Sequence, residues 1–354
     1  MQRRHLLGRL AALAACPALA PDLGHVFAQA DGIAPAFTLL VAGPDGGQTS
    51  RWGNACALAM SPCFPGSPNI TTQTTGGLDG VTGANQLDAL VVPDGKTAAI
   101  LPGAALIAFL TGDTRVHFDP TRWAPLLAGV NSGVLMLRAS NGSVPDLSTL
   151  RAAAPLRIAA DQPQSRDLAA LLGLARLGIN TAPVFGLRDT NTKTNAFIDG
   201  EVDAVFLCGE GVPEDAAPLA ASGAVPLFCL GTLDATGKPG PDPFFPGLPD
   251  AISLGAAAAP ELETAYLAAA AAAQLDFLLV LPRLSDPNAV TLWAQAASAA
   301  PNSSPAFAEA ASASSVSLQP AAALAGALAA LALPPSARTS LQVFLAKNYG
   351  WQPG

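Results

Sequence analysis

The sequence predicts an α/β fold with mainly parallel sheets, and two observations lead to this prediction. Short apolar runs of strand type alternate with helical patterns along much of the chain, which is the rhythm of βαβ units. Half of the 354 residues are hydrophobic and only 12% are charged, so the chain can bury one large lobe or two medium ones.

The first strands and helices follow one another in pairs. Strand-like runs at 37–43, 69–75 and 97–103 each precede a helical pattern, and a further clean strand lies at 133–140. The rhythm then restarts with a strand at 156–160. A helix follows whose apolar residues keep helical spacing from Leu168, and Gly178 is expected to end it. Two more buried strands are expected at 201–208 and 225–231.

The first 30 residues are typical of an export signal. Arg3, Arg4 and Arg9 precede a short apolar core, and Ala28-Gln29-Ala30 is a small-x-small cleavage site. The core is shorter than the about 20 residues that span a bilayer. Arg3-Arg4 also resembles a twin-arginine signal. Cys16 ends a segment that resembles a lipoprotein box, so a lipid tether is the alternative to the favoured export in soluble form.

Charge argues against nucleic acid as a partner. Removal of residues 1–30 takes away three arginines and Asp22, which changes the net charge from −8 to −10. An acidic chain without a basic tract does not attract nucleic acid or anionic membrane surfaces.

Four cysteines remain after removal of the signal, and an even number in an exported chain suggests disulfides. Three connectivities are possible, and we expect the local pairs Cys56 with Cys63 and Cys208 with Cys229. Four buried free thiols are the alternative.

The residues leave little room for catalysis. His117 is the single histidine after residue 30, so a catalytic triad or a multi-histidine metal site is almost excluded, and a surface position is expected for it. Glycine-rich motifs of nucleotide-binding proteins and the nucleophile elbow are absent from the sequence. We therefore expect no enzyme, no metal and no cofactor. The apolar stretches 265–282 and 321–333 are expected to be buried core helices rather than membrane spans.

Two strand–loop–helix units suggest a binding cleft. One contains Gly46 and Gly47 and the other spans 161–166. In an open α/β sheet, ligands bind beyond the carboxyl ends of strands, where helix N-termini offer free N–H groups. Glycines there let backbone amides approach a small anion, although a simple tight turn has the same sequence pattern.

Six motifs in register resemble the substrate-binding receptors of tripartite tricarboxylate transporters, the Bug family. The match runs from about residue 37 to 255, and beyond it only helical composition is evident. The matching segments are Pro44-Asp45-Gly46-Gly47, Gly76-Gly77-Leu78-Asp79-Gly80, Pro93-Asp94-Gly95-Lys96-Thr97, Phe118-Asp119-Pro120 with Trp123-Ala124-Pro125, Gly200-Glu201-Val202-Asp203-Ala204, and Phe245-Pro246-Gly247-Leu248-Pro249.

The resemblance implies a periplasmic, two-lobed binding protein of type II, a Venus flytrap whose lobes are joined by crossing hinge strands. Lobe one would hold residues 31–135 and 232–354, and lobe two residues 136–231. The function implied is capture of a small carboxylate between the lobes and delivery to integral membrane transporter subunits, by a monomer. An exported sensor module that works with a sensor kinase, or a scaffold of the same fold, is the first alternative. An exported enzyme is the second.

The resemblance also implies the ligand contacts, all of which carry over by position. They are Gly46, Gly47, Gln48, Thr49 and Ser50 from lobe one, and Gln164, Ser165, Arg166 and Phe185 from lobe two. Several of these residues depart from the family pattern. Ser50 stands where an aspartate is usual and Phe185 where a tyrosine is usual. Pro163 offers no N–H and Asp161 would repel an anion, for which Arg51, Arg166 and Arg188 could compensate.

Overall fold

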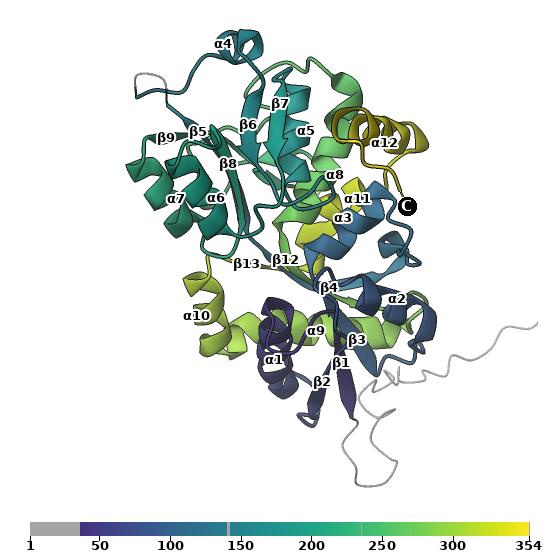
Figure 1. Cartoon of the computed structure of the whole chain (residues 1–354). Helices are drawn as coiled ribbons and strands as arrows, with labels where there is room; N and C mark the ends of the chain where they lie inside the picture. Colours follow the sequence, from purple (N-terminus) through teal and green to yellow (C-terminus); the bar gives the residue numbers. More distant parts are fainter. Residues whose placement is uncertain (1–35, 140–141, 235, 354) are drawn as a thin grey trace, which may run out of the picture. The chain divides into compact units, whose positions relative to one another are not determined.

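The computed structural model describes residues 36–139, 142–234 and 236–353. The predicted export signal and Cys16 lie outside the described residues. Two large sheets carry the fold, and the chain runs through part of the first sheet, then all of the second, then back to the first (Figure 1).

The first sheet has six strands in the order β13-β4-β12-β3-β1-β2. β1, β2 and β3 are parallel, whereas β12 is antiparallel to β3 and β4, and β13 is antiparallel to β4. Its strands are β1 (Phe37–Val41), β2 (Ile70–Thr74), β3 (Thr97–Leu101), β4 (Ala124–Val130), β12 (Leu275–Leu281) and β13 (Ser317–Pro320).

The second sheet has five strands in the order β7-β6-β8-β5-β9. β6 is parallel to β7 and β8, and β5 is antiparallel to β8 and β9. The strands are β5 (Ser132–Arg138), β6 (Leu156–Ala159), β7 (Thr181–Val184), β8 (Ala204–Gly209) and β9 (Ala224–Cys229), and a hairpin of β10 (Thr232–Leu233) and β11 (Pro239–Gly240) follows. The two-lobed α/β prediction is therefore confirmed, but both sheets are mixed rather than mainly parallel.

Helices cover both faces of the first sheet. α1 (Gln48–Met60), α9 (Pro287–Ser303) and α10 (Pro305–Ala313) share one apolar core with it. The other face packs against α2 (Val81–Leu90), α3 (Gly103–Thr111), α8 (Glu263–Gln274) and α11 (Ala325–Leu331). α12 (Pro335–Tyr349) closes the described chain and packs against α8 and α3.

The second sheet is covered in the same manner. α6 (Thr190–Ile198) and α7 (Val212–Ala221) bury one face. α5 (Leu168–Arg176) covers the other face and packs on α8, so one apolar core reaches from the first sheet to the second. The short helix α4 (Leu147–Ala152) lies before β6 and carries no buried residue.

The chain first changes sheet at a single residue. β4 ends at Val130 and β5 begins at Ser132, so Asn131 alone joins the two sheets there. Its N–H donates to the carbonyl of Gln274, next to the point where β12 begins, and the Gln274 side chain donates to the carbonyl of Gly231. The β4–β5 connection, the α8–β12 junction and the segment after β9 are thus joined by hydrogen bonds. The division into lobes stays a prediction, and this position of Asn131 supports a boundary near residue 131.

The cysteine prediction is wrong, since all four described cysteines are free thiols. Cys56 and Cys63 lie seven residues apart along α1 and the 3-10 turn after it, a rise of about 10 Å or more. Cys208 of β8 and Cys229 of β9 pair with neighbouring residues of β5, which lies between them, so they are about 10 Å apart. A disulfide needs Cα atoms within about 7 Å.

The stretch 265–282 is almost entirely buried but is not a single helix. Residues 265–274 are helical within α8, while the remainder forms β12, whose seven residues are all buried. The expectation of a buried core helix at 321–333 is wrong, because this stretch is a 3-10 turn followed by α11 and several of its alanines are exposed: Ala322, Ala323, Ala325, Ala329 and Ala332. No single helix of the described residues is long and apolar enough to cross a membrane. The helical segments 321–331 and 335–349 meet at a bend of 67°, and the two together have the length and composition of a membrane span.

Candidate functional site

A cavity of about 680 Å³ lies among the loops that follow β2, β3 and β6. These are carboxyl ends of strands, where open α/β sheets place their ligands. Loop 77–82, α3 with the loop after it, and loop 161–167 line the cavity together with Arg188 and Lys193. Residues of both sheets therefore enclose one space.

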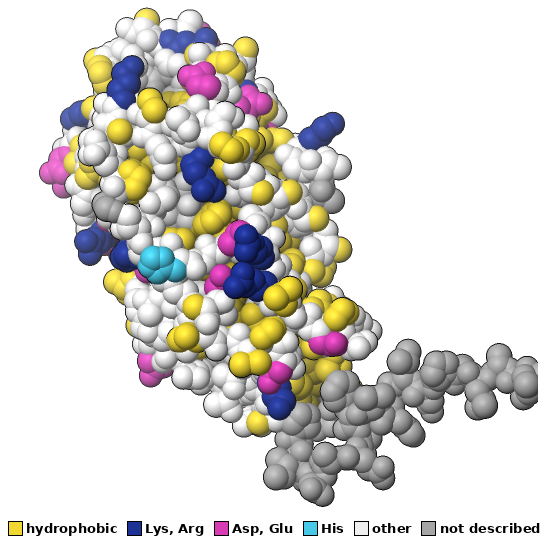
Figure 2. All heavy atoms as spheres, turned by 90° about the vertical axis from the view of Figure 1, so that its right-hand side faces the viewer, with side chains coloured by type: hydrophobic (Ala, Val, Ile, Leu, Met, Phe, Trp, Pro, Cys, Tyr) yellow, Lys and Arg dark blue, Asp and Glu magenta, His cyan; other side chains and the backbone are white. Residues whose placement is uncertain are grey.

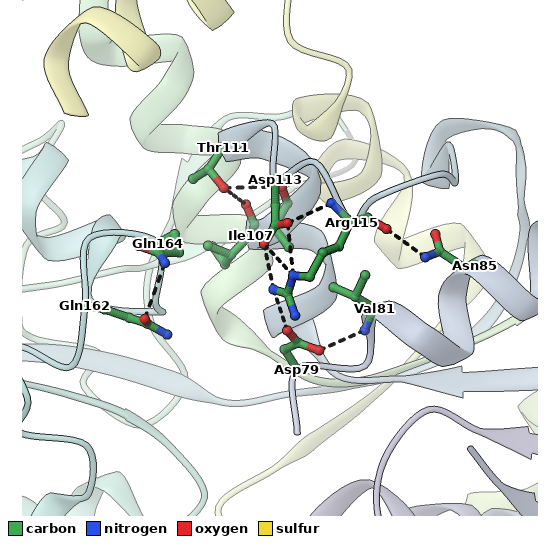
Figure 3. A network of polar contacts seen from close by, with 10 residues as sticks. Asp79, Val81, Asn85, Ile107, Thr111, Asp113, Arg115, Gln162 and Gln164 are labelled. Carbon is green, nitrogen blue, oxygen red and sulfur yellow. Dashed lines mark hydrogen bonds and ion pairs between the residues drawn. The ribbon is translucent and has the colours of Figure 1, made fainter. Parts of the chain in front are cut away.

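The wall from the first sheet carries a shared ion pair, which Figure 3 shows. Arg115 Nη2 lies 2.6 Å from Asp113 Oδ2 and 2.8 Å from Asp79 Oδ2. Hydrogen bonds from Arg115 outweigh desolvation and hold the pKa of Asp113 below its usual value. Two carboxylates thus share one guanidinium, and this wall has an excess of one negative charge.

Local backbone geometry explains the position of Asp79. Its Oδ1 accepts a hydrogen bond of 3.2 Å from the N–H of Val81, in the first turn of α2. Gly80 precedes α2 with φ +76°, and a Cβ there would lie 2.5 Å from Pro102 Cδ. Only glycine allows this close approach, so the Gly-Leu-Asp-Gly sequence holds the aspartate at the cavity.

The wall from the second sheet is built around Asp167. Asp167 Oδ2 accepts hydrogen bonds from the N–H of Asp161, at 2.8 Å, and from Ser165 Oγ, at 3.1 Å. Asp167 Oδ1 pairs with the buried Lys193 of α6. Arg188 Nε lies 3.4 Å from Asp161 Oδ1, so the aspartate expected to repel an anion is itself paired.

Gln164 brings an acceptor without a donor to the same wall. Its Nε2 donates to Gln162 Oε1 at 3.3 Å, as Figure 3 shows. Its Oε1 is buried and accepts no hydrogen bond from the described residues. Burial of an unpaired acceptor is costly, and a ligand N–H or O–H would remove that cost.

A second polar cluster lies where the chain returns to the first sheet, around the buried Asp276 of β12. Asp276 Oδ1 accepts from Gln48 Nε2 at 2.6 Å and from Asn131 Nδ2 at 3.1 Å. Arg166 Nη1 lies 3.8 Å from the same oxygen, and its Nη2 donates to the carbonyl of Leu275. Desolvation raises the pKa of Asp276 to about 6, since the attraction of Arg166 offsets it only in part.

Glu210 follows β8 of the second sheet and reaches α1 of the first. It accepts hydrogen bonds from Arg51 Nη2 at 2.8 Å and from Trp52 Nε1 at 2.7 Å. Desolvation acts to raise the pKa of Glu210, but these hydrogen bonds outweigh it and lower the pKa. These contacts hold the two sheets together on the α1 side.

The predicted site residues fall into two groups. Gln164, Ser165 and Arg166 line the cavity, whereas the segment Gly46–Ser50 and Phe185 do not. The N–H groups of Gly46 and Gly47 bond to Asp45 Oδ1 and to the carbonyl of Pro44, so these amides are already used. Phe185 packs edge-on against Tyr349 of α12, with centroids 5.8 Å apart. Ligand binding by the segment and by Phe185 stays a prediction.

Sequence reasoning missed the charged residues of the first wall. Asp79 lies in the second glycine-rich motif, which offered the signal, whereas Asp113 and Arg115 follow α3 without any motif. His117 is exposed, as expected, and is the histidine visible in Figure 2. Among the described residues, no group of three or more metal-ligating side chains is placed to hold an ion.

Solved structures share this fold. No protein-family model and no curated protein sequence matches the chain. A TctC solute-binding protein from Polaromonas, solved without ligand, matches with a TM-score of 0.65 and 14% identity, over 88% of this chain and 98% of that one. An R. palustris protein solved with adipate matches with a TM-score of 0.52 and 18% identity, over 90% and 98%. The chain therefore has the two-lobed α/β fold of periplasmic solute-binding proteins.

Proposed function

We propose that this protein is an extracytoplasmic receptor that binds a small carboxylate in the cavity between its two sheets. The cavity of about 680 Å³, lined from both sheets at the carboxyl ends of strands, is the observation that carries the proposal. The likeness to a solute-binding protein over nearly the whole of both chains supports it.

The ligand carboxylate fits best on the wall from the second sheet. Arg166, Arg188 and Lys193 line the cavity there against Asp161 and Asp167, which leaves an excess of one positive charge. Arg166 can form charge-assisted hydrogen bonds with a carboxylate.

We further propose that the receptor binds without catalysis and passes its ligand to integral membrane transporter subunits. Export through residues 1–30 would bring it to the periplasm as a soluble monomer. The acidic chain and the binding-protein fold support these proposals, which rest on the sequence and on the family resemblance.

A ligand screen tests the function. Mono- and dicarboxylates are added to the purified protein and its melting temperature is measured, because a ligand bound to the native state raises it. The variant Ala104→Phe fills the cavity from α3 and should abolish the shift. Ala89→Phe, at an exposed alanine of α2 that does not line the cavity, is the matched control. No shift with any carboxylate, or an equal shift in Ala104→Phe, would refute the proposal.

A further inference from the structure

The second glycine-rich motif, Gly76–Gly80, places the negative charge of Asp79 at the cavity, where it would repel a ligand carboxylate. Asp79 lines the cavity, and its side chain is 34% exposed. Asp113, with a 14% exposed side chain, lines it as well, and both compete for the single guanidinium of Arg115. A ligand with a carboxylate at each end would bring its second charge against this wall, and like charges at such distances repel strongly.

The two walls carry opposite excess charge. The first-sheet wall has Asp79 and Asp113 against Arg115, as Figure 3 shows. The second-sheet wall has three cations against two carboxylates. Asp276 lies outside the cavity, and its Oδ1 is 3.8 Å from Arg166 Nη1, so it offsets part of this positive charge when it is ionised. A ligand held between the walls therefore meets a field that runs from negative to positive.

Gln164 gives independent evidence for a donor on the ligand. Gln164 lines the cavity, and its Oε1 is buried and accepts no hydrogen bond from the described residues. A carboxylate cannot satisfy this oxygen, because it offers only acceptors, whereas an ammonium group has three donors.

We propose that Asp79 makes this receptor selective for amino carboxylates, that is, for ligands with a carboxylate at one end and an ammonium group at the other. The carboxylate lies against Arg166 and Lys193, and the ammonium group lies between Asp79 and Gln164 Oε1. This inference rests on the proposed function, since it names the ligand class of the same cavity.

Matched ligand pairs test the selectivity by calorimetric titration of the purified protein. Adipate is compared with 6-aminohexanoate, and succinate with 4-aminobutanoate, so that within each pair one carboxylate is replaced by an ammonium group at similar length. We expect the amino carboxylate to bind at least about tenfold more tightly in one or both pairs.

The variant Asp79→Ser removes the charge and keeps an oxygen that can accept from the N–H of Val81. It should weaken amino carboxylate binding by about 10- to 100-fold and leave dicarboxylate binding equal or stronger. Asp94→Ser is a close control, because Asp94 also precedes a glycine and accepts from the N–H two residues on, at 2.9 Å, yet does not line the cavity. It should bind like the wild type.

The outcomes separate this inference from the proposed function. If carboxylates bind but the dicarboxylate of each pair binds as tightly as its partner, the inference is wrong and the receptor function stands. If nothing in the wider screen binds, both are wrong. Should Asp79→Ser fail to fold, the wild-type ligand pairs decide, together with Gln164→Met, which removes the acceptor and should weaken amino carboxylates alone.

Discussion

The indole Nε1–H of Trp52 lies 2.6 Å from Oδ2 of the buried Asp276, and this short contact crosses from α1 to β12. The same N–H lies 2.7 Å from Glu210 Oε1, which belongs to the second sheet. One donor thus contacts both carboxyl groups, and a direct hydrogen bond between these groups acts to raise the pKa of Asp276 and to lower that of Glu210.

Trp52→Phe should therefore destabilise the protein by about 1–3 kcal/mol, although the ring still packs on Phe277. The indole hydrogen bond acts to lower the pKa of both Glu210 and Asp276. Its loss disfavours the ionised forms, so the destabilisation should be larger at pH 8 than at pH 5. Urea unfolding at both pH values measures this, and an equal cost at both would contradict it.

Asp276 should give stability a pH dependence of its own. Its pKa is raised from 3.8 to about 6 in the folded state, so the folded protein holds the proton more tightly than the unfolded chain. Stability from this group is present below pH 3.8 and is lost as pH rises through 6, by up to about 3 kcal/mol. The difference in unfolding free energy between wild type and Asp276→Asn should fall by this amount between pH 4 and pH 7. A pH-independent difference would show that the carboxyl stays ionised.

Titration with a thiol reagent should detect all four described cysteines as free thiols. Denatured, unreduced protein cleaved after residue 30 should titrate with four thiols, one for each of the free cysteines Cys56, Cys63, Cys208 and Cys229. In the native state Cys63 should react first, because burial raises the pKa of Cys208 to about 12 and that of Cys229 to about 11. A count of two thiols or fewer would mean that at least one of the two local disulfides forms, which would contradict the free cysteines of the structure.

Gly47→Val tests the ligand role that the family resemblance gives to the loop before α1. A Cβ at this position would lie 3.1 Å from both Pro44 Cγ and the Pro44 carbonyl oxygen, so the variant should melt at a lower temperature. The loop does not line the cavity, and we therefore expect the ligand affinity to stay within about threefold of wild type. Loss of binding with an unchanged melting temperature would restore the loop to the binding site.

Patterns of local origin were predictable from the sequence. β1 and β3 lie in apolar runs and β2 in a run rich in β-branched residues, as predicted, and Gly178 follows α5 with φ +76°, as its position after the last apolar residue predicts. Loop 161–166 was found because it follows a strand and precedes a helix. Five of its six residues, all but Pro163, line the cavity.

Features that depend on distant pairing were not predictable. Residues 265–282 are apolar except for Gln274 and Asp276, and this composition does not show that α8 ends at Gln274 and β12 begins at Leu275. The change follows from tertiary structure, because β12 fills the gap between β3 and β4. The clustering of Asp276 with Gln48 joins residues more than two hundred positions apart, and no local pattern encodes it.

The order of strands in the first sheet also constrains how the chain acquires its structure. β3 and β4 are consecutive in the sequence, yet β12 lies between them, and β4 pairs only with β12 and β13. The strands of the second sheet lie together within 132–229 and are complete long before β12 leaves the ribosome. The first sheet can therefore be completed only after the second one. Until residue 275 has been synthesised, β3 and β4 each have an unpaired edge. Pairings this distant in sequence fold slowly, so a chain truncated before β12 should be captured by chaperones or degraded rather than accumulate.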